Sequence, residues 1–463
     1  MFHVKRGIKM SIIASIATGQ AVGGIGIVRL SGEGCIDLAD RVFACASGNK
    51  LSDSAGYRAH YGSVSDGSEW QDEAVAIVYR APKSYTGEDV VELCCHGGPA
   101  VTRMALRACI EQGAQPAAPG EYTRRAFENG KLSLAQAEAV MSIISAEGRQ
   151  AALAAQAAHD GRLNRRIDAI AQQLIDLSVR IAAWCDYPDE EEIPEVTDKQ
   201  LTDGLSDVLN QLVTLRREGE TGKLLREGVD TVICGKPNVG KSTLMNLLSG
   251  CERSIVTDIP GTTRDVVEEQ IRLDDCVLRI SDTAGLHDTS DQVEKIGVER
   301  TWRRLSECAL VLAVFDGSKE LDDDDRKLID SLSDKPTIAV VNKSDQQQKI
   351  DIEYISNKIQ HTVYTSALKG DGLAQLTAAI MDVTQLAGLD PSAGMIINER
   401  QCDCVRRAAE AVEEALNAAC AGVTFDAVGV SIQYAIDCLL ELTGERASDR
   451  IVDGVFAQFC VGK

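Results

Sequence analysis

One stretch decides the fold of the central part of this chain: Gly235-Lys236-Pro237-Asn238-Val239-Gly240-Lys241-Ser242. It fits the spacing G-x-x-x-x-G-K-[ST], follows the apolar run Val229–Cys234 and precedes a helical pattern over Thr243–Leu248. In that context the backbone N–H groups of the loop can surround phosphates at the start of a helix. The Lys241 ammonium can reach the outer phosphates, and the Ser242 hydroxyl can bind Mg²⁺. The stretch therefore predicts a nucleotide-binding loop.

A second motif, Asp282-Thr283-Ala284-Gly285, follows another apolar run of residues. Its carboxylate can hold the water shell of Mg²⁺, and the Gly285 N–H can meet the γ-phosphate. The position after it is Leu286, so the glutamine that orients the attacking water in Ras-like enzymes is missing. We therefore expect another group to position the water.

A third motif, Asn342-Lys343-Ser344-Asp345, follows the predicted strand Thr337–Val341 and indicates which base is bound. The Asp345 carboxylate can accept two hydrogen bonds from guanine, one from N1–H and one from the exocyclic amine. Adenine offers no such pair of donors, so ATP would leave the carboxylate unpaired. Ser366-Ala367-Leu368 completes the predicted guanine pocket.

These motifs in this order resemble the translation-factor-related GTPases, with Gly261-Thr262-Thr263-Arg264-Asp265 as the switch segment. The resemblance implies that Thr263 joins the Mg²⁺ site. Asn238 in the phosphate loop, together with the switch sequence, resembles the potassium-dependent branch of these enzymes. This second resemblance implies that K⁺ is bound by the Asn238 side chain and by the carbonyls of Thr257, Ile259 and Thr262. It also adds to the expected nucleotide-binding residues Thr243 and the segment Thr257, Asp258, Ile259, Pro260, Gly261, Thr262 and Thr263.

Glu294, in the polar stretch Asp288–Lys295, is the motif-matched candidate for a general base or water-orienting group. Two plainer interpretations stand beside these assignments. Asn238 can simply shape the loop, and a single surface glutamate is usually only solvated.

Hydrophobic periodicity divides the chain into three kinds of structure. Residues 1–128 alternate strand-like runs with helical stretches, which predicts an α+β domain. Residues 129–225 and 386–463 repeat apolar positions every three or four residues, as two halves of one helical domain would. Residues 226–385 predict an inserted α/β P-loop domain with a mostly parallel sheet. The sequence leaves open whether the helical halves meet.

Composition excludes several classes of protein. The 463 residues carry 48 basic and 70 acidic side chains, and the net charge of −22 argues against a coat that binds nucleic acid by bulk charge. The 15 cysteines lack paired C-x-x-C spacing, so reduced thiols in a cytoplasmic protein are expected. No apolar run is long enough for a membrane span. The short run Met10–Ala17 after three basic residues imitates a secretion signal but has no clean cleavage site.

The flanking segments carry a more specific resemblance. The sequence from Gly120 to Leu132, the following Ala135-Gln136-Ala137-Glu138-Ala139-Val140 and the terminal Phe459-Cys460-Val461-Gly462-Lys463 resemble the MnmE (TrmE) family of tRNA-modification GTPases. The resemblance covers residues 25–463 and the order of all domains. It implies a homodimer that works with the FAD-dependent protein MnmG, as a heterotetramer, to add an aminomethyl or carboxymethylaminomethyl group to C5 of the wobble uridine in tRNA.

The same resemblance implies a 5-formyltetrahydrofolate-type cofactor in the N-terminal domain. Its motif-matched contacts are Arg29, Glu92, Lys131 and Lys463. Cations suit the glutamate carboxylates of folate, and a carboxylate suits the N–H donors of the pterin. Cys460 can be a reactive thiol near that chemistry or a small buried residue.

Three departures from the family pattern and two other functions remain to be weighed. A Pro-Pro pair before Gly23 is missing, Ser133 stands where Asp is common, and the first ten residues match nothing.

A ribosome-assembly or RNA-checkpoint GTPase would share the nucleotide motifs, but it would need a basic RNA-binding module that the region after Leu386 lacks. A signalling switch without chemistry would leave Lys131, Cys460 and Lys463 unexplained.

Overall fold

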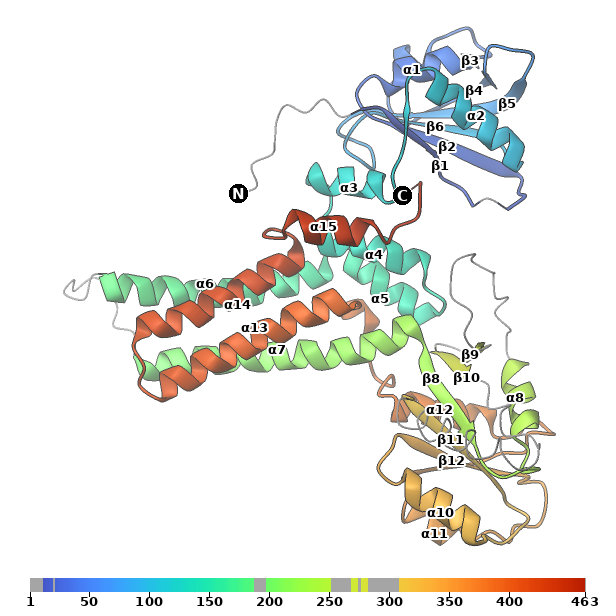
Figure 1. Cartoon of the computed structure of the whole chain (residues 1–463), viewed down its shortest axis with the longest axis vertical. Helices are drawn as coiled ribbons and strands as arrows, with labels where there is room; N and C mark the ends of the chain where they lie inside the picture. The colour runs from blue at the N-terminus through green and yellow to red at the C-terminus, as the bar shows by residue number, and fades with distance from the viewer. Residues whose placement is uncertain are drawn as a thin grey trace, which may run out of the picture. The chain divides into compact units, whose positions relative to one another are not determined.

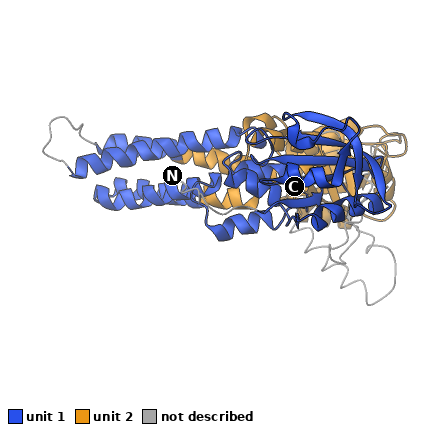
Figure 2. Cartoon of the chain, turned by 90° about the horizontal axis from the view of Figure 1, so that it is seen from above, with its two compact units in different colours: residues 1–141, 159–208, 407–463 blue, residues 142–158, 209–406 orange. Residues whose placement is uncertain are grey.

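The computed structural model describes residues 11–19, 21–186, 197–250, 268–273, 276–281 and 308–462 (Figure 1). The chain forms two compact units, coloured in Figure 2. The first comprises Met1–Met141, His159–Val208 and Arg407–Lys463, and the second Ser142–Ala158 and Leu209–Arg406. No helix in the described ranges has the length and apolar character that crossing a lipid bilayer requires.

The N-terminal part of the first unit is built on a seven-stranded sheet. The strands stand in the order β3-β4-β5-β6-β2-β1-β7, and every neighbouring pair is antiparallel except β1 and β7. Their bounds are β1 Ile13–Ile16, β2 Ile25–Ser31, β3 Phe43–Cys45, β4 Arg58–Ser65, β5 Gln71–Tyr79, β6 Val90–His96 and β7 Gln115–Pro116.

Two helices, α1 (Cys35–Val42) and α2 (Pro99–Glu111), cover one face of this sheet. Burial alternates along β5 and β6, as it must where one face of a strand packs on a core and the other does not. Leu30, Leu93 and Cys109 are all fully buried in this core. The α+β prediction for this part of the chain is therefore confirmed.

The apolar run Met10–Ala17 contains β1, which pairs with β2 along its whole length. Ile13 and Ala14 are each 1% exposed, so the run that imitates a secretion signal supplies part of the sheet core.

The helix α4 (Leu134–Ile144), which follows α3 (Glu121–Glu128) in the sequence, is capped at its N-terminus by Ser133. The Ser133 hydroxyl accepts a hydrogen bond from the Gln136 N–H at 3.1 Å, so serine caps here as the common aspartate would.

The two halves of the helical sequence meet in the first unit. α6 (Arg162–Asp186) precedes the P-loop region and α14 (Phe425–Thr443) follows it, and the two helices pack along each other. α15 (Asp449–Phe456) packs against α3 (Glu121–Glu128), and Phe456 lies in a core shared with Leu134 of α4. The sequence left this meeting open, and the structure settles it.

Four helices in the described ranges have residues in both units: α4, α5 (Arg149–His159), α7 (Asp198–Glu227) and α13 (Glu399–Cys420). Within the second unit, the Lys223 ammonium of α7 lies 2.9 Å from the Glu399 carboxylate of α13. Gly219 faces Ile396 and Cys402, and a side chain there would press on both. The chain therefore leaves the helical region along α7 and returns to it along α13.

The residues between α7 and α13 in the sequence form a six-stranded sheet with the order β13-β12-β11-β8-β10-β9. All pairs are parallel except β9 and β10, which confirms the prediction of a mostly parallel sheet. The strands are β8 Val229–Cys234, β9 Glu268–Leu273, β10 Cys276–Ser281, β11 Leu310–Asp316, β12 Thr337–Asn342 and β13 His361–Tyr364, and the helices are α8 Lys241–Ser249, α10 Asp323–Leu332, α11 Ile352–Ser356 and α12 Leu373–Val383.

Candidate functional site

The phosphate loop joins β8 to α8 at the carboxyl end of the sheet. Gly235 and Gly240 have φ values of +137° and +102°, a region that side chains strain. A Cβ on Gly240 would overlap the Asn342 amide, and one on Gly235 would overlap the Val314 carbonyl. Only glycine fits at both positions, so the loop can hold its backbone open toward a ligand.

Lys241 begins α8 and lies back over the loop. Its ammonium donates to the Gly235 and Lys236 carbonyls, both at 2.7 Å. Partial burial lowers the pKa of Lys241 from its usual value. Ser242, the next residue of α8, is exposed, as is Asn238 at the top of the loop with a φ of +64°. The hydroxyl and amide oxygens of these two side chains are thus accessible.

Asn342, at the end of β12, ties the phosphate loop to the base-pocket segment. The amide nitrogen of Asn342 donates to the Val239 carbonyl at 2.9 Å. Its amide oxygen accepts from the Ala367 N–H at 3.0 Å. Because Asn342 is only 3% exposed, these bonds fix the spacing between the two segments.

Asp345 and Ser366, predicted to form the guanine pocket, lie in direct contact. The Ser366 hydroxyl donates to the Asp345 carboxylate at 2.9 Å, and the Lys369 ammonium lies 3.7 Å from it. The Ser366 hydrogen bond is the main cause that lowers the pKa of Asp345, so the carboxylate stays an acceptor. Leu368 is 84% exposed at the edge of this pocket.

Three carboxylates outside the motifs, those of Asp316, Asp322 and Asp325, pair with lysines inside them. The Lys343 ammonium donates to Asp316 at 2.6 Å and to the Asn238 carbonyl at 3.1 Å. Lys236 forms ion pairs with Asp322 and with Asp325 at the start of α10. Sequence analysis missed these contacts, although the runs of acidic residues after β11 were a usable signal for them.

Several predicted site residues lie outside the described part of the chain, and their roles stay predictions. They are Thr257, Asp258, Ile259, Pro260, Gly261, Thr262 and Thr263 of the switch segment, Asp282, Thr283, Ala284 and Gly285 of the second motif, the candidate base Glu294, and the terminal Lys463.

In the first unit, the structure brings Arg29 and Glu92 together. They are direct partners across β2 and β6, and their guanidinium and carboxylate groups lie 2.8 Å apart. The Arg29 guanidinium also donates to the Gly462 carbonyl at 3.2 Å, next to the predicted Lys463. The rings of Tyr85 and Tyr122 lie 5.9 and 5.5 Å from it.

The other predicted folate contacts are placed less directly. The Lys131 ammonium donates to the Pro82 carbonyl at 3.1 Å, in the same loop that carries Tyr85. Cys460 is exposed, and its carbonyl accepts from the Gly120 N–H at 3.3 Å. Every cysteine in the described ranges is a free thiol, as expected. The Gly462 backbone, two residues after Cys460, thus lies beside the Arg29–Glu92 pair.

Known protein families and individual relatives match nearly the whole chain. The family model of the MnmE helical domain matches residues 134–460, and that of the GTP-binding protein TrmE N-terminus matches residues 12–131. The tRNA modification GTPase MnmE of Bacillus velezensis is 38% identical over 459 residues, covering 98% of this chain and 100% of the relative. The chain belongs to the MnmE family of tRNA modification GTPases. It is accordingly a GTP hydrolase.

Other relatives extend the comparison. The tRNA modification GTPase MnmE of Bacillus subtilis is 37% identical over 459 residues, which is 98% of this chain and 100% of the relative. Among solved structures, the G domain of the FeoB iron transporter from T. maritima is 26% identical, with a TM-score of 0.26. It covers 34% of this chain and 99% of its own.

Proposed function

We propose that this GTPase acts on tRNA and, with the FAD-dependent protein MnmG, adds an aminomethyl or carboxymethylaminomethyl group to C5 of the wobble uridine. A 5-formyltetrahydrofolate-type donor supplies the one-carbon unit. The observation that carries the proposal is the Arg29–Glu92 pair beside the C-terminal segment, in a chain that also holds a guanine-type nucleotide site.

The nucleotide site favours GTP on chemical grounds. The Asp345 carboxylate is an acceptor whose lowered pKa keeps it ionised, and guanine alone offers it two adjacent donors. The glycine-lined loop and Lys241 would surround the phosphates of the bound nucleotide. An ATP molecule would bring an acceptor to an acceptor at Asp345, and its binding would suffer accordingly.

Two cations fit the oxygen donors of the loop. Ser242, with Thr263 from the switch segment, would hold Mg²⁺, which neutralises charge on the phosphates when bound. The exposed Asn238 amide oxygen, with carbonyls of Thr257, Ile259 and Thr262, would hold K⁺ in the place of an arginine finger. Glu294 is the residue proposed to orient the attacking water. The plainer role of Asn238 in shaping the loop predicts no response to K⁺.

The N-terminal site suits a folate. Arg29 and Glu92 are half-buried and mutually paired, so a ligand with both carboxylates and N–H donors can replace each partner in turn. Tyr79 donates to the same Glu92 carboxylate at 3.4 Å, which holds the acidic group in place. Lys131 and Lys463 add cations for the folate glutamate tail. Cys460 is exposed close to this site, which suits a reactive thiol.

The proposal also includes a homodimer whose P-loop domains associate in the GTP state and separate after hydrolysis. The helical segments α6, α7, α13 and α14 connect the P-loop region in sequence to the N-terminal domain. They are the continuous elements through which such a movement can reach the folate and tRNA site.

Mass spectrometry of nucleosides from total tRNA tests the proposal. Cells that lack the protein are expected to lose C5-aminomethyl-type wobble uridines, and the wild-type chain is expected to restore them. Lys241→Met, which removes the cation for the outer phosphates, is not expected to restore them, whereas the exposed-site control Asp371→Asn is. An unchanged nucleoside profile would instead favour the ribosome-assembly or RNA-checkpoint function.

A further inference from the structure

The loop between β5 and β6, residues 80–89, touches both sides of the proposed folate site. The Tyr85 ring lies 5.9 Å from the Arg29 guanidinium, and the Pro82 carbonyl accepts a hydrogen bond from the Lys131 ammonium at 3.1 Å. We call this segment the 80–89 loop. Its shape therefore determines how Arg29 and Lys131 are placed relative to each other.

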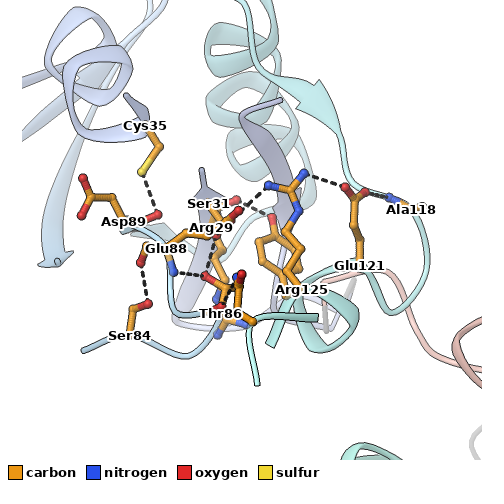
Figure 3. A network of polar contacts seen from close by, with 12 residues as sticks. Arg29, Ser31, Cys35, Ser84, Thr86, Glu88, Asp89, Ala118, Glu121 and Arg125 are labelled. Atoms are coloured by element: carbon orange, nitrogen blue, oxygen red, sulfur yellow. Dashed lines mark hydrogen bonds and ion pairs between the residues drawn. The ribbon is translucent and has the colours of Figure 1, made fainter. Parts of the chain in front are cut away.

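A chain of buried hydroxyl and carboxylate groups holds the 80–89 loop (Figure 3). The Ser31 hydroxyl donates to the Glu88 carboxylate at 2.8 Å. Because its only hydrogen is used there, the Thr86 hydroxyl must be the donor in the 2.8 Å contact between Thr86 and Ser31. Ser31 and Thr86 are both fully buried. Glu88 thus receives the end of a directed hydrogen-bond chain.

The other face of the loop rests on the segment that carries Lys131. The Asn129 side chain donates to the Thr86 carbonyl at 2.8 Å. Gly87 has a φ of +81°, and a Cβ there would lie 3.4 Å from the Lys131 side chain. Loop and Lys131 are therefore packed as one piece, and a shift of the loop moves both Tyr85 and the carbonyl that holds Lys131.

Arg125 of α3 supplies the positive charge that pairs with Glu88 of the 80–89 loop. Its guanidinium donates to Glu88 at 3.1 Å and to Glu121 at 2.8 Å, and the side chain is only 3% exposed. Figure 3 shows the fork of Arg125 between the two carboxylates. The Arg125 Nε is buried without a hydrogen-bond partner in the structure.

Such a buried ion pair is a poor source of stability, because removing both charges from water costs about as much as their attraction returns. Its gain is geometric, since a planar fork fixes two carboxylates at once. We propose that Arg125 is a positioning residue that holds the 80–89 loop, through Glu88, in the shape that the folate site requires. The inference rests on the proposed function for its ligand, and on the contacts above for its geometry.

Hydrogen exchange and folate titration of the full-length protein test the inference. In Arg125→Met we expect amides of the 80–89 loop to exchange markedly faster, and the Kd for 5-formyltetrahydrofolate to rise about tenfold or more. Arg125→Lys keeps the charge but reaches one carboxylate only, so intermediate values are expected. Arg124→Met is the matched control, because neighbouring Arg124 pairs with Glu128 and Asp453 at the surface.

A merely structural role would lower the melting temperature without changing the Kd of the folded protein. Wild-type exchange and wild-type Kd in folded Arg125→Met would overturn the inference. Should that variant not fold, Arg125→Lys takes its place, and the same wild-type values would overturn the inference there. Absence of folate binding by the wild-type chain would refute the proposed cofactor, and loop exchange would still decide whether Arg125 holds the loop.

Discussion

In the proposed guanine pocket, the choice of base depends on single side chains, above all on Asp345. In Asp345→Asn, the amide oxygen can still accept from guanine N1–H, but the amide nitrogen would present a donor to the exocyclic amine, so GTP affinity is expected to fall about 10- to 100-fold. Xanthine carries a carbonyl where guanine has its amine, so the variant is expected to gain affinity for xanthosine triphosphate. Titration with both nucleotides measures the change.

Asp371→Asn is the control for this prediction. The Asp371 side chain is exposed, and only its backbone carbonyl is bonded to Ser366. It should bind GTP like the wild type. If Asp345→Asn also kept the wild-type GTP affinity, the guanine pocket would have to be built from other residues.

The roles of single residues could be predicted where their partners lie close in the sequence, and could not be predicted where the partners lie far away in it. The glycines of the phosphate loop and the Asn342 and Asp345 positions follow from short motifs at strand ends, where local spacing determines geometry. Asp316 and Arg125 could not be placed in this way, because their partners Lys343 and Glu88 lie 27 and 37 residues away. An arginine on the buried face of α3, beside Tyr122 and Ala126, was the available signal for Arg125.

Among helices and strands, hydrophobic patterns predict the buried elements well and the partly exposed ones poorly. β8 and β12 are continuous apolar runs in a parallel sheet and were expected at nearly their observed bounds. β4 has a weak sequence signal, because its first four residues are exposed or half-buried and show no clear alternation. Its pairing with β5, which is long-range information, makes it a strand.

The packing of α15 on α3 and α4 depends on one aromatic cluster. Phe456 is 2% exposed and lies between Phe127 and Phe459, with ring centroids 6.2 and 5.3 Å away. Phe456→Ala is expected to lower the free energy of unfolding by about 3–5 kcal/mol. Val430→Ala on α14, where the side chain is 70% exposed, should change it by less than about 0.5 kcal/mol.

Urea unfolding followed by circular dichroism measures both changes. Because the C-terminal segment continues from α15 to the Arg29–Glu92 pair, Phe456→Ala should also weaken folate binding. Equal stability of the two variants would show that α15 contributes little to the packing of the first unit.

The contact between the start of β5 and the end of β6 should depend on pH. The His96 imidazole forms a hydrogen bond with the Asp72 carboxylate, and Nδ1 and Oδ1 are 2.7 Å apart. This hydrogen bond raises the pKa of His96 above its usual value of 6.5. A raised folded-state pKa means that the stabilisation is complete below pH 6.5 and is lost as the pH rises through the folded value. NMR titration of the His96 imidazole measures this pKa.

In Asp72→Asn, the charge that favours the protonated ring is gone, and the pKa of His96 should return toward 6.5. Asp66→Asn, in the exposed turn between β4 and β5, is the control and should leave the titration unchanged. A His96 pKa that is identical in wild type and Asp72→Asn would show that the pair does not form in solution.

For the chain as a whole, the P-loop region is inserted in the sequence between two packed helical halves, and this limits which elements the proposed GTP cycle could move. α6 and α14 meet in the first unit, so α7 and α13 are the two connections between this packed pair and the β8–β13 sheet. A change at the phosphate loop therefore has two continuous helices along which it can act on the rest of the chain. This arrangement follows from the order of domains, which the sequence predicted, and from a packing that it left open.

The proposed cycle makes hydrolysis depend on both K⁺ and association of the P-loop regions. GTP turnover per molecule should rise at least about tenfold when Na⁺ is replaced by K⁺, by analogy with the gain that transition-state charges supply. Turnover should also rise with protein concentration, since the proposed cycle requires two P-loop domains to associate. Asn238→Ala, which removes the exposed amide oxygen of the loop, should abolish the K⁺ response while leaving GTP affinity within about threefold. Equal turnover in Na⁺ and K⁺ at every protein concentration would leave Asn238 with only its loop-shaping role, and would separate hydrolysis from any dimer-driven movement.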